Sequence, residues 1–239
     1  MKYLLIILVL IGAYAAFSYF KILYYIHYSK NPQIAQIDQS FGNGSPLRYI
    51  AAGDSTAVGI GASSIENTYT VKIAKSLGES GSVEYRNVGV IGSKTDDVLN
   101  KQLPQIIEFN PDIVTISIGA NDNTHLVSLD RIYKNYQEII KRLLNETQAK
   151  IYITNIPNFT GAELLPTVAI AVLEHRSNKL NPKLIALENI PGNERVRIIN
   201  IHDFGWDQFT DRSDTYSLDY FHPSDAGYEN WTKAFLSKM

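Results

Sequence analysis

The stretch Leu47–Gly61, LRYIAAGDSTAVGIG, decides the predicted fold. Its first half, Leu47–Ala52, is a short apolar run with an aromatic and a β-branched residue, which predicts a buried strand. The run ends abruptly at Gly53-Asp54-Ser55, so Ser55 lies at the carboxyl tip of that strand. Open α/β sheets form their ligand sites at such tips, but serine is also a common turn or helix N-cap residue. A chemical role for Ser55 therefore depends on the residues downstream.

Length and composition fit one large α/β domain. The chain has 239 residues, of which 45% are hydrophobic and 19% are charged. These values are typical of a globular protein with a sizeable core. The net charge of −2 gives no general electrostatic basis for binding nucleic acid. The sequence has no cysteine, which excludes disulfides, thiolate catalysis and cysteine-based zinc sites.

The first 30 residues are predicted to be a membrane anchor or a signal peptide. Tyr3–Phe20 and the following run Ile22–Tyr28 are apolar and together reach the roughly 20 residues of a membrane span. Ala13-Tyr14-Ala15 offers a signal-peptide cleavage site, but the apolar run continues beyond it and ends among tyrosines typical of a membrane interface. We therefore expect an uncleaved transmembrane helix, a polar linker over residues 31–46 and a folded domain over residues 47–239. That domain is expected outside the cytoplasm, and would be secreted if the segment were cleaved.

The apolar pattern after Ser55 alternates between strands and helices. Further strands are predicted at residues 83–88, 112–118, 150–156 and 196–201, and helices at residues 67–78, 93–109, 130–147, 167–189 and 224–236. This alternation predicts a three-layer α/β/α fold around a five-stranded parallel sheet. With right-handed crossovers, the economical strand order is the flavodoxin-like 2-1-3-4-5.

Three strand tips converge in that order. The first strand lies between the second and the third, so Ser55, Gly92 and Asn121 follow three adjacent strands at the topological switch point. Glycine permits close backbone approach, and asparagine offers a neutral N–H donor. Taken singly, Gly92 also suits a turn, and Asn121 also suits a loop in which it satisfies its own backbone.

A fourth segment, Asp219-Tyr220-Phe221-His222-Pro223, precedes the last predicted helix. The spacing of three residues lets the carboxylate of Asp219 hold Nδ1 of His222, which leaves Nε2 as a base. With Ser55, the segment provides a nucleophile, a base and an orienting carboxylate. Taken alone, Asp219 and His222 also suit a helix cap and its neighbour.

The order and spacing of the four blocks resemble those of the SGNH family, also called GDSL esterases/lipases. The blocks are Gly53-Asp54-Ser55, Gly92, Gly119-Ala120-Asn121-Asp122 and Asp219-x-x-His222-Pro223. The likeness covers about residues 47–239. Thr56 stands where the family has leucine, and Tyr220 stands where glycine is frequent. Neither residue supplies a catalytic atom, so both departures bear on subfamily more than on activity.

The resemblance implies an SGNH hydrolase fold and roles for five residues. Ser55 attacks an ester carbonyl and forms an acyl-enzyme, His222 transfers the proton to the leaving alcohol, and Asp219 orients His222. The backbone N–H groups of Ser55 and Gly92 and the side-chain amide of Asn121 hold the oxyanion. This mechanism requires neither a metal nor an organic cofactor.

Other polar residues are expected to have structural roles. Asp54 and Asp122 flank strand tips, where acids often accept backbone N–H bonds. The spacing of His125, His175 and His202 is not that of metal ligands.

The predicted function is a membrane-tethered serine ester hydrolase of the esterase/lipase or lysophospholipase type. Its expected partners are a small-molecule or lipid ester and, through the N-terminal helix, a membrane. The apolar segment Phe159–Leu173 either walls an acyl groove or is an ordinary packed helix face. A carbohydrate O-acetyl esterase acting on cell-wall glycans is an alternative within the same class. A non-catalytic lipid- or glycan-binding module on the same fold is the alternative from another class.

Overall fold

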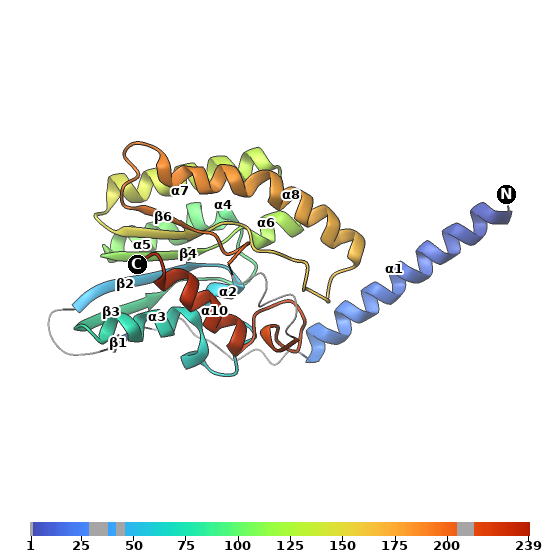
Figure 1. Cartoon of the computed structure of the whole chain (residues 1–239), viewed down its shortest axis with the longest axis horizontal. Helices are drawn as coiled ribbons and strands as arrows, with labels where there is room; N and C mark the ends of the chain where they lie inside the picture. Colours follow the sequence, from blue (N-terminus) through green and yellow to red (C-terminus); the bar gives the residue numbers. More distant parts are fainter. Residues whose placement is uncertain (1, 29–37, 42–45, 205–212) are drawn as a thin grey trace.

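A computed structural model describes residues 2–28, 38–41, 46–204 and 213–239. Its centre is a six-stranded sheet in the order β1-β3-β2-β4-β5-β6 (Figure 1). All neighbouring strands are parallel except β1, which runs antiparallel to β3. The strands are β1 (Asp38–Phe41), β2 (Pro46–Gly53), β3 (Ser82–Asn87), β4 (Ile113–Ser117), β5 (Lys150–Thr154) and β6 (Val196–Ile199).

The five predicted strands correspond to β2–β6 and follow the predicted order. The predicted number is wrong by one edge strand, because β1 lies in residues 31–46, which the sequence indicated to be a linker. Its four residues, DQSF, contain one apolar side chain and so lack an alternating pattern. Pairing with β3 and the contact between the Phe41 and Tyr85 rings, 6.5 Å apart at their centroids, hold this strand in place.

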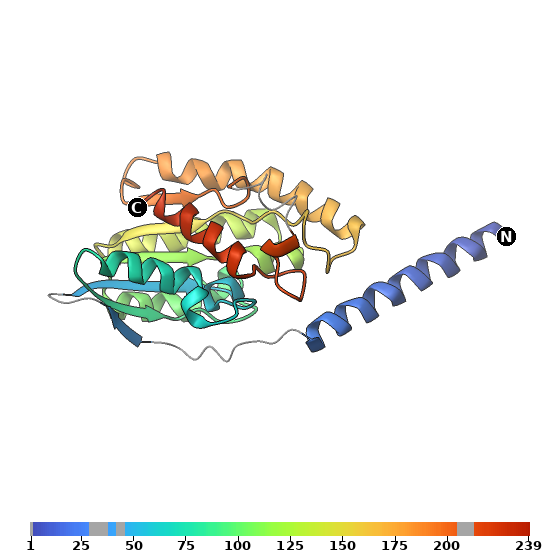
Figure 2. The same cartoon turned by 60° about the horizontal axis from the view of Figure 1, so that its bottom comes forward.

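Helices cover both faces of the sheet. The helices α5, α7 and α8 lie over one face, whereas α3 and α10 lie over the other (Figures 1 and 2). The helices along the chain are α1 (Lys2–Tyr28), α2 (Ser55–Val58), η1 (Ile65–Asn67), α3 (Tyr69–Gly78), α4 (Thr95–Asp97), η2 (Val98–Gln102), α5 (Leu103–Phe109), α6 (Ala120–Thr124), α7 (Leu129–Glu146), α8 (Thr167–Ile185), η3 (Ala186–Asn189), η4 (Ser213–Thr215) and α10 (Asp225–Leu236).

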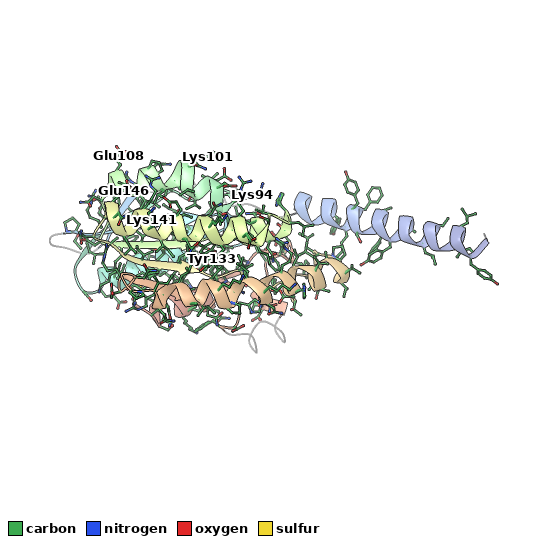
Figure 3. All side chains as sticks on the ribbon, turned by 90° about the horizontal axis from the view of Figure 1, so that it is seen from above. Lys94, Lys101, Glu108, Tyr133, Lys141 and Glu146 are labelled. Atoms are coloured by element: carbon green, nitrogen blue, oxygen red, sulfur yellow. The ribbon has the colours of Figure 1, made fainter. Side chains whose placement is uncertain are left out.

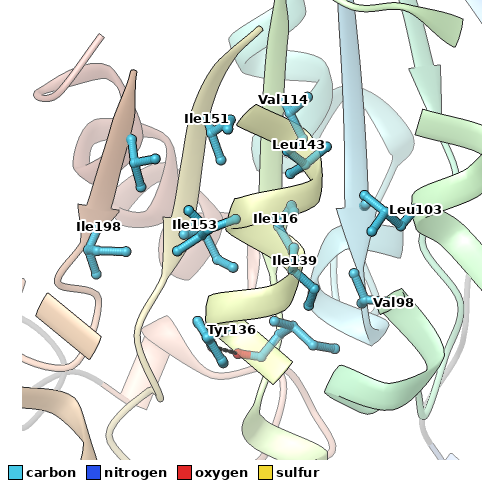
Figure 4. Packing of buried hydrophobic residues seen from close by; sticks show 14 of the residues in the cluster. Val98, Leu103, Val114, Ile116, Tyr136, Ile139, Leu143, Ile151, Ile153 and Ile198 are labelled. Atoms are coloured by element: carbon cyan, nitrogen blue, oxygen red, sulfur yellow. Dashed lines mark hydrogen bonds between the residues drawn. The ribbon is translucent and has the colours of Figure 1, made fainter. Parts of the chain in front are cut away.

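Strands β2, β4, β5 and β6 place side chains in two separate cores, one on each face of the sheet. In β4, Val114 and Ile116 point towards the core under α5, α7 and α8 (Figure 4), whereas Ile113 belongs to the core under α3 and α10. Because both faces are covered, all five residues of β4 are buried. Each fully buried aliphatic side chain of this kind contributes roughly 1.5–3 kcal/mol to stability.

Helix α7 shows how a helix is fixed on the sheet. Its inner face carries Tyr136, Ile139 and Leu143, which are fully buried, while its outer face carries charged residues such as Lys141 and Glu146 (Figure 3). The Tyr136 hydroxyl lies 2.8 Å from the carbonyl oxygen of Ile118 and 3.0 Å from that of Thr154 (Figure 4). The helix is thereby tied to the ends of β4 and β5, next to the carboxyl edge of the sheet.

The predicted helix over residues 93–109 is not continuous. The single turn α4 is followed by η2, which has π-helical hydrogen bonding, and then by α5, in whose first turn Pro104 lies. Proline is tolerated there because the first N–H groups of a helix have no partner within the helix. At the start of α4 the Asp97 carboxylate accepts the backbone N–H of Lys94 at 3.0 Å.

The N-terminal helix α1 extends away from the sheet (Figures 1 and 2). Across the described parts of the chain, no helix combines the length and the apolar character needed to cross a membrane. The predicted transmembrane helix is therefore not supported. Most of the predicted linker, and residues 205–212 between β6 and η4, lie outside the described residues.

Candidate active site

The end of β2 holds Ser55 rigidly. Gly53 has a φ of +131°, and a Cβ atom there would lie 1.9 Å from the carbonyl oxygen of Ser117 on β4, so only glycine fits. One residue further, the N–H of Asp54 donates to the same carbonyl oxygen at 3.0 Å. The Asp54 carboxylate then caps α2 by accepting the N–H of Thr56 at 3.0 Å. Ser55 thus lies at the carboxyl edge of the sheet, as the sequence predicts, and begins the short helix α2, which was not predicted.

The turn between Ser217 and His222 is built around the carboxylate of Asp219. One oxygen of this carboxylate accepts the backbone N–H groups of Phe221 and His222, both at 2.9 Å, and the Ser217 hydroxyl at 2.7 Å. The other oxygen lies 2.6 Å from Nδ1 of His222. Tyr220 takes a left-handed conformation in this turn, with a φ of +55°, a backbone region that favours glycine.

The environment of Asp219 keeps it ionised. Burial alone would raise the pKa of this carboxyl group, but the hydrogen bond and the charge of His222, together with the backbone and Ser217 donors, lower the pKa to about 2. An ionised carboxylate only accepts hydrogen bonds, so Nδ1 of His222 carries the proton. The other ring nitrogen, Nε2, lies 2.8 Å from Oγ of Ser55. The structure therefore brings Ser55, His222 and Asp219 into one hydrogen-bonded chain.

Asn121 lies beside this chain of groups, and Gly92 lies in the adjacent loop. Asn121 lines the same cavity as Ser55 and His222, whereas Gly92 lines a neighbouring hollow. Gly92 has a φ of +78° in a turn closed by the N–H of Ser93 and the carbonyl oxygen of Val90, 3.1 Å apart. Among the described residues, the N–H groups of Ser55 and Gly92 donate to no other group of the protein, so both are available to a ligand.

Two other acidic residues near the site, Asp54 and Asp122, accept hydrogen bonds from neighbouring protein groups. Desolvation raises the pKa of Asp54 to about 6 and also raises the pKa of Asp122. Asp122 accepts both the N–H and the hydroxyl of Thr95, at 2.9 and 2.6 Å. The Thr56 hydroxyl lies 2.8 Å from Asp54 and 2.6 Å from the Ser117 hydroxyl. Both carboxylates thus bind neighbouring protein groups, and Thr56 joins α2 to β4.

The cavity beside Ser55 holds about 780 Å³ of empty space, part of it open to solvent. Its apolar lining includes Phe159, Ala162, Phe221 and Trp231. Of the predicted acyl wall Phe159–Leu173, only the beginning reaches the cavity. Later residues pack as an ordinary helix: Leu173 is buried in the core, while Val168 and Val172 are exposed.

A second histidine, His202, lines the same cavity and was not predicted as part of the site. Its Nδ1 lies 2.6 Å from Asp203, and its Nε2 lies 3.1 Å from Glu174 on α8. The only sequence signal for this residue is its place just after β6, at the same edge of the sheet as Ser55. Within the described ranges, no group of three histidine or acidic side chains is placed to hold a metal ion.

Comparisons with known proteins agree with this geometry. A sequence model of the GDSL-like lipase/acylhydrolase family matches residues 51–229. The lipase Lip_vut3 from a goat rumen metagenome has a similar structure, with a TM-score of 0.61 and 23% identity over 80% of this chain and 96% of that chain. An acetylxylan esterase from Geobacillus stearothermophilus gives a TM-score of 0.61 and 17% identity over 83% of this chain and 95% of that chain.

A phospholipase A1 from Streptomyces albidoflavus has the same fold, with a TM-score of 0.58 and 16% identity over 82% of this chain and 100% of that chain. At these low identities, the TM-scores of 0.58–0.61 show a shared fold alone. A comparison with curated protein sequences gives no match. The family match covers most of the chain and confirms the resemblance drawn from the four sequence blocks: the chain belongs to the GDSL-like lipase/acylhydrolase family, whose members hydrolyse esters.

Proposed function

We propose that this protein is a serine ester hydrolase that works through an acyl-enzyme intermediate. The observation that carries the proposal is the chain of two short contacts, 2.8 Å from Oγ of Ser55 to Nε2 of His222 and 2.6 Å from Nδ1 of His222 to Asp219. This is the arrangement in which a hydroxyl, a base and an orienting carboxylate act as a unit.

The first step forms the acyl-enzyme. Nε2 of His222 accepts the Ser55 proton while Oγ bonds to the ester carbonyl carbon, and the carbonyl oxygen becomes an oxyanion. Asp219 stabilises the resulting imidazolium and keeps its ring oriented. The imidazolium then donates its proton to the leaving alcohol as the bond to that alcohol breaks. Water repeats the same sequence in the second step, which releases the carboxylic acid and restores Ser55.

The oxyanion is assigned to three neutral donors. These are the free N–H groups of Ser55 and Gly92 and the side-chain amide of Asn121. Replacing Asn121 by alanine removes one such donor, and loss of a donor of this kind typically lowers kcat on the order of 10²–10³-fold.

The lining of the cavity favours an ester with a small or medium acyl group. Phe159, Ala162, Phe221 and Trp231 present apolar surface next to Ser55, and apolar surface gains most from an apolar acyl chain. Lipid esters, including lysophospholipids, are the proposed substrates. Acetylated sugars remain the competing substrates within the same chemistry.

The test is hydrolysis of p-nitrophenyl esters of graded acyl length by the full chain, with Ser55→Ala as its matched control. We expect activity only with the serine, and higher kcat/KM for acyl chains longer than acetyl. Equal rates with and without Ser55 would leave a non-catalytic lipid- or glycan-binding module. A preference for acetylated oligosaccharides would favour the O-acetyl esterase. The location outside the cytoplasm stays a prediction, which cell fractionation tests.

A further inference from the structure

Gln102 is a buried glutamine that binds the backbone immediately before the nucleophile. Its Oε1 accepts the N–H of Gly53 at 2.8 Å, and its Nε2 donates to the carbonyl oxygen of Gly53 at 2.9 Å. The side chain is 1% exposed. Strand β3 ends at Asn87, which pairs with Ala51, so Gly53 extends beyond its neighbour. On this side the Gly53 carbonyl oxygen still accepts the N–H of Val90 at 3.0 Å. The Gln102 amide therefore supplies the acceptor for the Gly53 N–H and a second donor to its carbonyl oxygen.

The helix that carries Gln102 is itself unusual. Gln102 is the last residue of the π-helical turn η2, which separates α4 from α5. Turns of this kind are rare and occur frequently at functional sites. Figure 1 shows α4 and α5 on the same side of the sheet.

The same amide reaches the loop that contains Gly92. Nε2 of Gln102 donates a second hydrogen bond to the Ser93 hydroxyl at 3.1 Å. The carbonyl oxygen of Ser93 accepts a hydrogen bond from Nδ2 of Asn121 at 3.0 Å. The backbone N–H of Ser93 donates to the carbonyl oxygen of Val90 and closes the turn around Gly92. Ser93 is 4% exposed. One buried serine thus contacts both loops that carry oxyanion donors.

We propose that Gln102 and Ser93 form a brace that positions the oxyanion donors relative to Ser55. Nδ2 of Asn121 has two hydrogens. The bond to Ser93 fixes one of them, and the other is left for the substrate oxygen. Through Gln102, the same serine is tied to Gly53, two residues before Ser55. Neither Gln102 nor Ser93 lines the cavity, so both are positioning residues. This inference rests on the proposed ester hydrolysis.

The test compares three variants of the full chain. Gln102→Glu has nearly the same shape and keeps the acceptor for Gly53, but it loses both donors. Ser93→Ala is milder, because it removes only the hydroxyl and keeps the carbonyl group that binds Asn121. Gln105→Met is the matched control, because Gln105 is an exposed glutamine in α5 whose amide donates to the Lys101 carbonyl oxygen and to no other group in the described part of the chain.

We expect Gln102→Glu to lower kcat on the order of 10–100-fold with KM changed less than about threefold, since a displaced donor loses part of the 10²–10³-fold effect of a missing one. Ser93→Ala is expected to lower kcat about tenfold, and the double variant no further than Gln102→Glu alone. Affinity for a boronic acid, which forms a tetrahedral adduct on Ser55, should fall in parallel with kcat/KM. Gln105→Met should match the wild type.

Three results would overturn the brace. The first is a Ser93→Ala variant with wild-type kcat and boronic-acid affinity. The second is a folded Gln102→Glu variant that also keeps both. The third is a loss of activity that follows the melting temperature while the boronic-acid affinity of the folded fraction is unchanged. Failure of the proposed function looks different, because wild type and Ser55→Ala would then hydrolyse esters equally.

Discussion

Two histidines line one cavity, and each contacts a carboxylate through Nδ1 at 2.6 Å. They differ at the other ring nitrogen. Nε2 of His222 faces the hydroxyl of Ser55 at 2.8 Å, whereas Nε2 of His202 faces the carboxylate of Glu174 at 3.1 Å. A hydroxyl can donate a proton to the ring, but a carboxylate can only accept one. The partner of Nε2 therefore separates the base of the proposed mechanism from a histidine held between two carboxylates.

The charges follow from these partners. Burial alone would lower the pKa of His202, but its hydrogen bonds to Glu174 and Asp203 outweigh burial and raise the pKa. With carboxylates on both sides, His202 carries two N–H groups and offers no lone pair to a substrate. Proximity to the cavity and a carboxylate partner are thus insufficient for catalysis by histidine.

Exchanging each histidine for glutamine gives the largest predicted contrast. His222→Gln removes both the base and the acid of the proposed mechanism, and we expect kcat/KM to fall on the order of 10⁵-fold. His202→Gln leaves a hydrogen-bonding side chain between the two carboxylates, and we expect less than about a tenfold loss. Steady-state kinetics on a p-nitrophenyl ester measures both. Equal losses would contradict the distinction between the two histidines.

Replacing the carboxylate partner of each histidine should also affect kcat differently: Asp219 contacts His222 and Glu174 contacts His202. Asp219→Asn places an amide against Nδ1 of His222 and favours the ring tautomer that cannot accept the serine proton, so kcat should fall about 10⁴-fold. The matched control is Glu174→Gln. The Glu174 carboxylate accepts the backbone N–H of Phe159 at 2.6 Å, and the amide oxygen of glutamine can still accept this hydrogen bond. We expect kcat to change less than tenfold in this control. A Glu174→Gln variant as inactive as Asp219→Asn would break the comparison.

Stability should depend on pH in opposite ways at the two sites. Because the folded-state pKa of His202 is raised, its contribution is complete below about pH 6.5 and is lost as pH rises through the raised value. Because the pKa of Asp219 is lowered to about 2, its contribution is present above about pH 4 and is lost as pH falls towards 2.

Urea unfolding across the pH range tests this second difference. In His202→Gln, the free energy of unfolding should no longer fall as pH rises above about 6.5, whereas its fall at acidic pH should remain. An unchanged alkaline slope in that variant would show that His202 is not held as a cation.

The smallest predicted effect concerns Tyr220. Its φ of +55° costs a tyrosine about 1 kcal/mol relative to glycine. Tyr220→Gly and Tyr220→Ala lose the same ring, so the glycine variant should be about 1 kcal/mol more stable than the alanine variant, with kcat within about twofold. Chemical denaturation measures the difference. Equal stability of the two variants would mean that the turn carries no backbone strain.

Features with local causes could be predicted from the sequence. The β-branched run in β4 and the amphipathic pattern of α7 reflect burial of particular faces, and the predicted strand order followed from the alternation of elements. The blocks at Ser55, Asn121 and His222 were found because short motifs lie at the ends of those elements. Their convergence was predicted from the strand order, and the structure adds the distances between the groups.

Features with distant causes could not be predicted. Strand β1 depends on its pairing with β3 more than on its own side chains. The π-helical turn exists where Gln102 reaches Gly53, 49 positions earlier in the chain. His202 is distinguished by Glu174, 28 positions away. Such contacts connect residues whose sequence neighbourhoods carry no signal of one another.

Covalent trapping of the nucleophile tests the central claim most directly. A fluorophosphonate added to the full chain should form one adduct, which peptide mass spectrometry should place on Ser55. The rate of labelling should fall at least about 10³-fold in His222→Gln, since general-base assistance contributes on that scale, and remain near the wild-type rate in His202→Gln. An adduct on another residue, or equal labelling rates in the wild type and His222→Gln, would contradict the assignment of Ser55 and His222.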